Sequence, residues 1–268
     1  MSTSARPAAS TGRCRCPGTS IRSCWRSSSR RCGCSSIWRR SAGRCSASGR
    51  GSVRCDRDFR LIETLRWSAG DGYYLLERHL ARLGASARHF GMTCDIEAVR
   101  AALDRAAATL DGTQRVRLLL DRDGAVSVSA TAIPAHDPGA VLRYALSDRP
   151  VDSGDPHRRH KTTRRAALDD ERERLAAETG CDEALFVNER GELTEGSYTS
   201  LFVERGGRLL TPPLSCGLLD GTLRRELLER PDGRVSERIL YPRDLAESDA
   251  VFLGNSVRGL LRARPVGR

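Results

Sequence analysis

The chain has 268 residues, enough for one large domain or two smaller ones, and a formal net charge of +11 at pH 7. Residues 1–55 hold twelve arginines and no acidic residue, whereas the other 213 residues carry 33 basic and 34 acidic side chains, so the body is nearly neutral and nucleic acid is not its expected partner. No stretch approaches the roughly 18 consecutive apolar residues of a membrane span, and no secretory signal is recognisable. We therefore expect a cytoplasmic protein without a membrane partner.

The N-terminal tail, residues 1–57, has an unusual composition. Arginine, serine, cysteine and glycine dominate it, and it lacks the apolar periodicity from which a packed core is built, so we expect it to be disordered. Four interpretations remain open: a zinc site, a transit peptide, a basic arm for nucleic acid, and translation from a wrong frame or from a start codon too far upstream. The last is our preferred hypothesis. The body has only three, widely spaced cysteines, which fits a reducing cytoplasm and no disulfide framework: Cys94, Cys181 and Cys216. We predict no metal site in the body.

The first half of the body combines strand and helix patterns. Apolar residues alternate where we predict strands and recur at helical spacing where we predict helices, and an Asp-Arg-Asp-Gly turn predicts a hairpin. In chain order we predict a strand (59–67), a turn (68–72), two helices (74–88 and 95–110, the second capped by Asp95), a hairpin (115–120 with 125–130), a loop (133–139) and a strand from Val141.

The second half follows a linker at residues 151–160. The predicted elements are a helix (162–179), a strand (183–187), a turn (188–191), a strand pair (200–203 with 208–210), a helix from 221 to about 230 capped by Asp220, and a strand (250–254) ending in Asn255 and Ser256. These elements predict an α+β body of two lobes, a small one over 58–150 and a large one over 161–268.

Lys161 is the only lysine among the 45 basic residues. An arginine guanidinium stays charged in proteins, whereas burial can tune a lysine amine to lose its proton and attack a carbonyl. Lys161 is therefore a candidate for covalent catalysis, most simply through a Schiff base. The alternative interpretation is an ordinary surface lysine.

Five segments stand in a distinctive order and spacing. Together they resemble the fold-type IV pyridoxal-phosphate enzymes, the class IV aminotransferase family, and the resemblance covers residues 58–266. That family includes branched-chain aminotransferases, D-amino-acid aminotransferases and 4-amino-4-deoxychorismate lyases. The resemblance implies a two-lobed fold, a pyridoxal 5'-phosphate cofactor bound mainly by the large lobe, and a homodimer. The segments are His79-Leu-Ala-Arg-Leu83, His160-Lys-Thr-Thr-Arg164, Glu192-Leu-Thr-Glu-Gly-Ser197, Leu218-Leu-Asp-Gly-Thr-Leu-Arg224 and Leu253-Gly-Asn-Ser-Val-Arg-Gly259.

The resemblance assigns two residues to the reacting end of the cofactor. Lys161 forms the covalent link and then moves protons. Glu195 lies beside the pyridine nitrogen and keeps it protonated, so that the ring accepts electrons. Without the motif, Glu195 would be an ordinary solvated turn residue.

The resemblance assigns five further residues to the cofactor phosphate. Arg82 suits a phosphate because a guanidinium can donate two parallel hydrogen bonds. Thr222 and Leu223 offer backbone amides at a helix N-terminus. Since Leu223 replaces the usual threonine, only its amide remains. Asn255 and Ser256 match a second element on the phosphate side. His79 and His160 are expected to be structural neighbours of these groups.

Within the family, the segments look most like the aminodeoxychorismate lyases, particularly the lyase domain fused behind an aminobenzoate-synthase component. The implied reaction converts 4-amino-4-deoxychorismate to 4-aminobenzoate and pyruvate in folate biosynthesis. The alternative is an aminotransferase for branched-chain or D-amino acids. An upstream synthase domain that is lost or out of frame would explain the tail. The candidates for the substrate side are Thr64, Arg115, Arg117 and Arg258.

Overall fold

The computed structural model describes residues 59–134, 137 and 139–267. The predictions for the tail, including the zinc site and the wrong-frame hypothesis, lie outside these residues. Within the described part of the chain, no helix is long and apolar enough to span a membrane, and no group of three or more histidine, cysteine, aspartate or glutamate side chains is placed to hold a metal ion.

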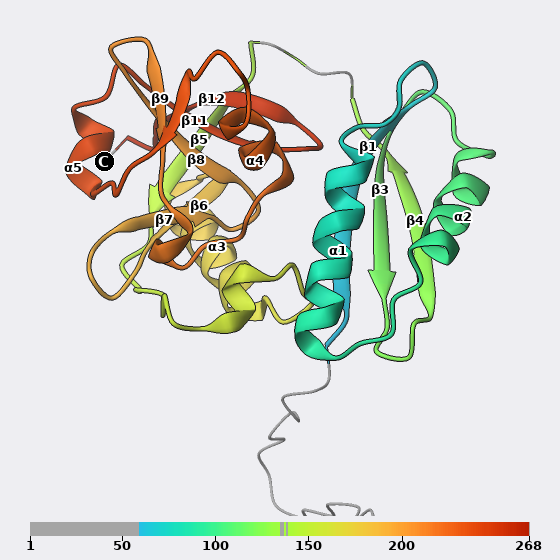
Figure 1. Ribbon diagram of the computed structural model, residues 1–268. Coiled ribbons are helices and arrows are strands. Elements are labelled where there is room, and N and C mark those ends of the chain that lie inside the picture. The colour runs from blue at the N-terminus through green and yellow to red at the C-terminus, as the bar shows by residue number, and fades with distance from the viewer. Residues whose placement is uncertain (1–58, 135–136, 138, 268) are drawn as a thin grey trace, which may run out of the picture. The chain divides into compact units, whose positions relative to one another are not determined.

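The first part of the described chain forms a four-stranded lobe, in which an antiparallel sheet has the strand order β2-β1-β3-β4 (Figure 1). Two helices cover one face of this sheet, and their apolar side chains share one core with it. The elements are β1 (Leu61–Ser68), β2 (Gly72–Tyr73), α1 (Leu76–Phe90), α2 (Ile96–Ala107), β3 (Thr113–Leu120) and β4 (Val126–Ala132).

Alternation along β3 explains the two faces of this sheet. Val116, Leu118 and Leu120 are buried against the helices, whereas Arg115 and Arg117 are exposed on the opposite face. Burying each large apolar side chain contributes roughly 1.5–3 kcal/mol, so the helix-covered face stabilises the lobe. The opposite face of β3 carries Arg115, Arg117 and the partly buried Leu119.

The rest of the described chain forms an eight-stranded lobe, with the strand order β10-β9-β8-β11-β12-β5-β6-β7. Its elements are β5 (Val141–Leu146), α3 (Ala166–Thr179), β6 (Glu183–Val187), β7 (Leu193–Gly196), β8 (Ser200–Arg205), β9 (Arg208–Thr211), α4 (Thr222–Leu228), β10 (Val235–Glu237), α5 (Pro242–Ala246), β11 (Ala250–Asn255) and β12 (Gly259–Pro265), with 3-10 turns at Pro156–Arg159 and Leu214–Cys216.

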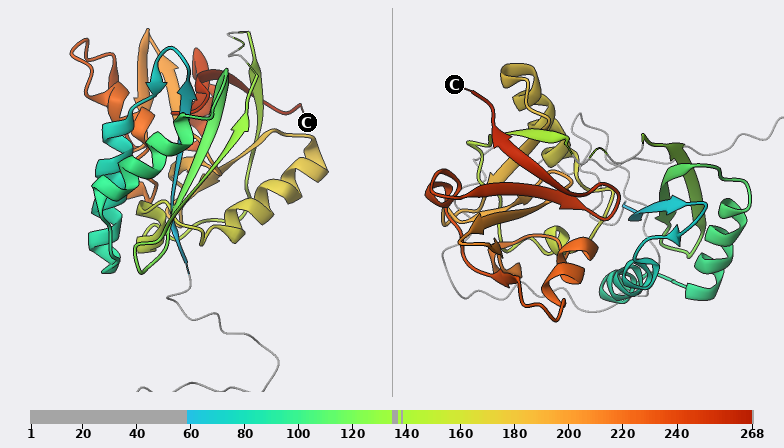
Figure 2. Two further views of the ribbon diagram at one scale, coloured as in Figure 1. Left: turned by 90° about the vertical axis from the view of Figure 1, so that its right-hand side faces the viewer. Right: turned by 90° about the horizontal axis from the view of Figure 1, so that it is seen from above.

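Side chains from distant strands of this sheet meet in one core. Tyr144, Leu193, Val203 and Leu253 belong to the same buried cluster, so the sheet curls around it. Separate clusters attach α3 to β6 and α4 to β10 and β11. Seen from above, α3 and α4 lie on opposite sides of β11 and β12 (Figure 2).

The strand predicted from Val141 exists, but it belongs to the eight-stranded sheet. As β5 it pairs in parallel with both β12 and β6. The chain therefore passes from one sheet to the other between β4 and β5, not at the linker expected near 151–160. Sequence patterns identify a strand but not its distant partner, which explains the difference.

The helix predicted over 162–179 begins later, at Ala166. The preceding residues are extended because they pair with β1: Ile62 N–H donates to Lys161 O and Thr163 N–H donates to Arg60 O, both at 2.9 Å. The predicted end is correct, since Gly180 caps the helix in a left-handed conformation with φ 71°. Lys161 is thus held where the two lobes join.

Two helix caps test the predicted N-termini. Asp95 caps α2 as predicted, accepting hydrogen bonds from the N–H groups of Glu97 and Ala98. Asp220 does not cap α4, whose N-cap is Gly221. The carboxylate of Asp220 is instead paired with arginines of the helix. Strands β2, β7, β10 and β12 and helix α5 were not predicted.

Candidate active site

A cavity of about 1400 Å³ lies between the two lobes. Its wall includes segments that are far apart in the sequence, from β1, α1, β3, the Lys161 segment, β7, α4 and the turn after β11. All eleven site residues predicted from the sequence line it: Thr64, Arg82, Arg115, Arg117, Lys161, Glu195, Thr222, Leu223, Asn255, Ser256 and Arg258.

The Lys161 amine lies in surroundings that favour its neutral form. Burial lowers the pKa of the amine to about 8, and the positive charge of Arg82 acts in the same direction. The carboxylates of Glu63 and Glu195 act in the opposite direction. A much larger fraction of this amine is therefore neutral near physiological pH than of an ordinary lysine, as attack on a carbonyl requires.

Glu195 projects from β7 and is buried. Burial raises the pKa of its carboxyl to about 7, although the charge of Arg158 and a hydrogen bond from Leu219 N–H (3.0 Å) lower it. Arg158 Nη2 lies 3.7 Å from Glu195 Oε1, and among the described residues this buried nitrogen has no hydrogen-bond partner. A cationic group beside Glu195 would favour its ionised form.

Glu183 holds the loop that follows Glu195. Its carboxylate accepts hydrogen bonds from Ser197 N–H (2.9 Å), Ser197 Oγ (2.5 Å) and Thr199 Oγ1 (2.8 Å). A Cβ atom at Gly196 would lie 2.3 Å from Thr199 Oγ1, so glycine is required there. The buried contacts of Glu183 with Ser197 and Thr199 therefore stabilise the loop that directly follows Glu195, and with it the position of Glu195.

Arg82 enters the cavity from α1 and is held by Glu63. Its Nε donates to Glu63 Oε1 (2.9 Å), its Nη2 to Glu63 Oε2 (2.6 Å) and its Nη1 to Asp220 O (3.1 Å). Burial would raise the pKa of Glu63, but Arg82 and His79 hold it at about 2. A guanidinium has five N–H donors, so two remain for a ligand anion.

The N-terminus of α4 faces the same end of the cavity. Thr222 and Leu223 are buried there, and the first N–H groups of a helix have no acceptor within it. The side chain of Leu223 belongs to the core beside Phe202, and it has no hydroxyl, so the backbone amide is the only hydrogen-bond donor that Leu223 can offer a ligand. A Cβ atom at Gly221 would lie 2.6 Å from Ser200 Oγ, so this backbone leaves little space.

The turn after β11 is tied to both lobes. Asn255 Oδ1 accepts hydrogen bonds from Val257 N–H and Arg258 N–H, both at 3.0 Å, and Asn255 Nδ2 donates to Tyr198 O (3.2 Å). Ser256 Oγ donates to Thr64 O in β1 (3.4 Å). Hydrogen bonds of the Asn255 and Ser256 side chains thus fix the turn, and both residues line the cavity.

The part of the cavity wall formed by β3 carries two arginines, Arg115 and Arg117. Arg117 pairs in register with Thr64 on one side and Ser129 on the other, and all three line the cavity. Burial and the charges of nearby arginines, Arg165 and Arg115 among them, lower the pKa of Arg117. Such a wall suits an anionic substrate.

Three contributors to the site were missed in the sequence. Glu63 is an inward-facing carboxylate within an apolar strand, and that position was a usable signal. Arg158 stands in the same basic run as Lys161, where composition gives no hint of its burial. Arg165 lines the cavity and donates to Ser197 O (2.8 Å), a contact that only the fold creates.

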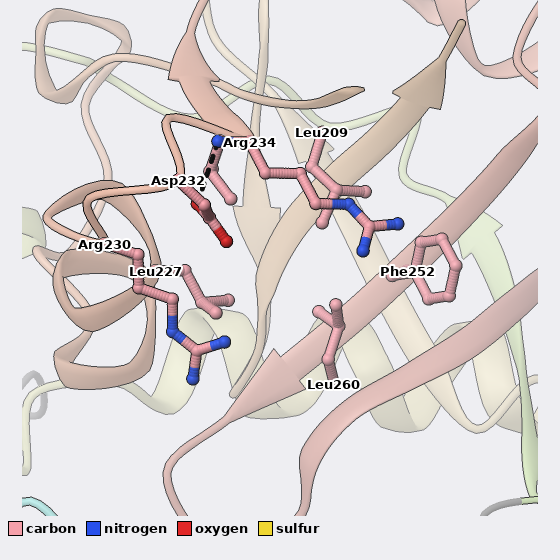
Figure 3. A pocket seen from close by; sticks show the side chains of 8 residues that line it. Leu209, Leu227, Arg230, Asp232, Arg234, Phe252 and Leu260 are labelled. Atoms are coloured by element: carbon pink, nitrogen blue, oxygen red, sulfur yellow. Dashed lines mark hydrogen bonds between the residues drawn. The ribbon is translucent and has the colours of Figure 1, made fainter. Parts of the chain in front are cut away.

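A second cavity, of about 220 Å³, lies in the eight-stranded lobe between α4 and strands β9 to β12 (Figure 3). Asp232 Oδ1 accepts a hydrogen bond from Arg234 N–H there (3.0 Å). None of the predicted site residues lines it, and it holds no amine or buried carboxylate. Its walls are Leu209, Leu227, Arg230, Asp232, Arg234, Val235, Phe252 and Leu260.

The chain is similar to proteins of one family. A model of the amino-transferase class IV family matches residues 60–266. A Schizosaccharomyces pombe protein provisionally named an aminodeoxychorismate lyase is 30% identical over 188 residues, which are 69% of this chain and 81% of the relative.

Solved structures have the same fold. One from Mesorhizobium loti, provisionally named an amino-acid aminotransferase, is 40% identical, with a TM-score of 0.73 over 78% of this chain and 100% of that one. The 4-amino-4-deoxychorismate lyase of Pseudomonas aeruginosa is 27% identical, with a TM-score of 0.66 over 85% of this chain and 92% of that one.

The residues in the cavity fit pyridoxal 5'-phosphate. Lys161 supplies an amine and Glu195 a buried carboxyl for the ring nitrogen, while Arg82 keeps spare donors for a phosphate. Relatives of this fold have been solved with pyridoxal phosphate or pyridoxamine phosphate bound. The predicted cofactor, enzyme class and two-lobed fold are thereby confirmed. The chain belongs to the class IV aminotransferase family of pyridoxal-phosphate enzymes.

Proposed function

We propose that this enzyme is a lyase that converts 4-amino-4-deoxychorismate to 4-aminobenzoate and pyruvate, a step of folate biosynthesis. The observation that carries the proposal is the pair of arginines, Arg115 and Arg117, in the wall of the cavity that Lys161 also lines. The substrate has two carboxylates, one on the ring and one on the enolpyruvyl group. A branched-chain amino acid has one carboxylate and an apolar side chain, for which the wall formed by Arg115 and Arg117 is a poor match.

Pyridoxal 5'-phosphate supplies an electron sink for the carbon that carries the substrate amine. Lys161 Nζ serves as the base that removes the proton from C4 of the substrate. Glu195 stabilises a proton on the ring nitrogen, and the positive charge of Arg158 favours the ionised form of Glu195 that this role needs. Arg82, together with the backbone at Thr222 and Ser256, holds the phosphate. The ring C–O bond to the enolpyruvyl group then breaks, and the ring becomes aromatic. The departing enolate takes up a proton, equivalent to the one removed from C4, and becomes pyruvate.

The remaining predicted residues act on the substrate. Arg117 and Arg115 bind its carboxylates from β3, and Thr64 lies beside them on β1. Arg258 reaches the cavity from the turn after β11, with its guanidinium carbon 5.8 Å from the centre of the Tyr198 ring. The names of the S. pombe and P. aeruginosa relatives support the lyase assignment.

The second candidate is an aminotransferase, supported by the name of the M. loti relative. It would use the same cofactor residues and differ in returning an amino group from a second substrate. Mixing the loaded enzyme with leucine or D-alanine in the absence of an acceptor separates the two. A lyase leaves the cofactor absorbance in its aldehyde-derived form, whereas an aminotransferase converts it to the pyridoxamine form within one turnover.

We further propose that the enzyme is a cytoplasmic homodimer that acts on small molecules. The family resemblance supports this assembly, and the neutral body argues against nucleic acid. Light scattering of the purified protein tests it, with twice the chain mass of 29.4 kDa as the expected result.

A further inference from the structure

His79 connects two groups at the phosphate end of the cavity. It lies on α1 with 1% of its surface exposed. Its Nδ1 is 2.6 Å from Glu63 Oε2, and its Nε2 is 3.3 Å from Thr222 Oγ1. Glu63 in turn holds Arg82. One imidazole ring therefore links the support of Arg82 to the hydroxyl of Thr222.

The proton on Nδ1 is fixed by Glu63. The pKa of Glu63 is about 2, so at neutral pH its carboxylate is ionised and can only accept hydrogen bonds. His79 Nδ1 must therefore donate. The variable position is Nε2, which either accepts from Thr222 Oγ1 or, when protonated, donates to it.

These two states have opposite consequences for Thr222. When Nε2 accepts, the hydroxyl proton of Thr222 points toward His79, and oxygen lone pairs are left for the cavity. When Nε2 donates, the hydroxyl proton of Thr222 is released and can point to a ligand oxygen. Only the second state offers an anion a donor.

The charges around His79 decide which state is stable. Glu63 faces it from β1, Arg82 from its own helix and Lys161 from the segment before α3, whereas α4 contributes the uncharged Thr222. Burial lowers the pKa of His79, Glu63 raises it, and Arg82 and Lys161 lower it further. Without an anion, the ring is therefore neutral. A phosphate dianion beside Arg82 and Thr222 would reverse this balance.

We propose that His79 is a positioning residue that takes up a proton at Nε2 when the cofactor phosphate binds, so that Thr222 Oγ1 turns from an acceptor into a donor toward the phosphate. The inference rests on the pyridoxal-phosphate cofactor, but it is the same for a lyase and an aminotransferase. It gives His79 a role in cofactor retention that is separate from the chemistry at Lys161.

Nitrogen NMR of protein labelled at its five histidines provides a direct test. At pH 8, where the phosphate is a dianion, His79 Nε2 should have the shift of an unprotonated nitrogen in the free protein. It should change to that of a protonated nitrogen when pyridoxal phosphate is added. The Lys161→Ala variant, titrated in the same way, should show the change without covalent attachment of the cofactor. Pyridoxal, which lacks the phosphate, should leave the nitrogen unprotonated.

Calorimetry in two buffers of different ionisation enthalpy gives an independent readout. The comparison is between Lys161→Ala and the double variant Lys161→Ala, His79→Gln. Binding of pyridoxal phosphate to the first should take up about one proton more than binding to the second. The glutamine amide can donate a hydrogen bond to Thr222 but cannot take up a proton. Thr222→Ser should keep the uptake, and Thr222→Val should weaken binding.

An Nε2 that stays unprotonated beside a bound cofactor, or equal uptake with and without His79→Gln, would overturn the proposal alone. Failure of the wild-type protein to bind pyridoxal phosphate would overturn the cofactor assignment as well.

Discussion

The cofactor half and the substrate half of the cavity are built in different ways. Lys161, Glu195 and Arg82 are each held by several hydrogen bonds or by backbone pairing, and both lobes contribute to them. Arg115 and Arg117 lie exposed on one face of a single sheet. Under the proposed function, the residues that carry the chemistry belong to a buried, hydrogen-bonded frame, whereas substrate choice depends on a few charges at an open wall.

Removing the lysine should have the largest effect and tests the rigid half. Lys161→Ala should abolish covalent cofactor attachment and lower turnover by about 10²–10⁴-fold, because the general base is lost. Lys161→Arg should fail equally, since a guanidinium keeps its charge. The cofactor absorbance and the turnover rate are the measurements.

In the wild type, the rate of covalent cofactor attachment should rise with pH and level off above about pH 8, the pKa of the Lys161 amine. Turnover at the wild-type rate in Lys161→Arg would exclude the amine as the base.

Replacing the buried carboxyl should have the next largest effect. Glu195→Gln removes a charge-assisted hydrogen bond to the ring nitrogen, typically about 1.5–3 kcal/mol, which corresponds to about 10–150-fold in kcat. The matched control is Glu192→Gln, since Glu192 is paired with Arg190 and does not line the cavity. Similar losses of kcat in Glu195→Gln and Glu192→Gln would contradict a specific role for Glu195 in the reaction.

The stiffness of the frame can be tested at Gly217, whose carbonyl accepts a hydrogen bond from Arg158 Nε (2.6 Å). A Cβ atom there would lie 2.4 Å from Ser153 Cα. Gly206 has a similar positive φ but nothing within 4 Å of its Cβ position. Gly217→Ala and Gly206→Ala should each lower the free energy of unfolding by about 1–2 kcal/mol through backbone strain. Gly217→Ala should lower it by about 1–3 kcal/mol more through overpacking. Thermal unfolding measures both, and equal losses would contradict the expected rigidity.

The open wall should show the smallest effect. Arg117→Met should raise KM for the lyase substrate about tenfold, because one charge-assisted contact of about 1.4 kcal/mol is lost, and kcat should change little. Arg105→Met on α2, outside the cavity, is the control. A fall in kcat at unchanged KM would place Arg117 in the rigid half instead.

The same division explains what the sequence could predict. The residues that we propose to contact the cofactor occur in short segments with fixed spacing, so Lys161, Glu195 and Arg82 were recognisable, and all three line the cavity. Glu63 and Arg158 were not, because their roles come from tertiary contacts with Arg82 and Glu195. The wall arginines were identified only as candidates, since one arginine among 44 looks like any other in the sequence.

The fold shows the same limits. Local signals, such as the alternation in β3 and the Asp95 cap, were correctly interpreted. The late start of α3 and the sheet membership of β5 depend on pairing with residues about 100 positions away, of which local patterns carry no information. Tertiary pairing overrode helix propensity at residues 162–165.

The central claim is the lyase reaction, and product release tests it most directly. Purified protein loaded with pyridoxal phosphate and given 4-amino-4-deoxychorismate should release 4-aminobenzoate and pyruvate in equal amounts. No amino acceptor should be required, and Lys161→Ala should form product about 10²–10⁴-fold more slowly. Loaded protein that releases no 4-aminobenzoate, yet transfers the amino group of leucine or D-alanine to a 2-oxo acid, would contradict the lyase assignment and establish the aminotransferase.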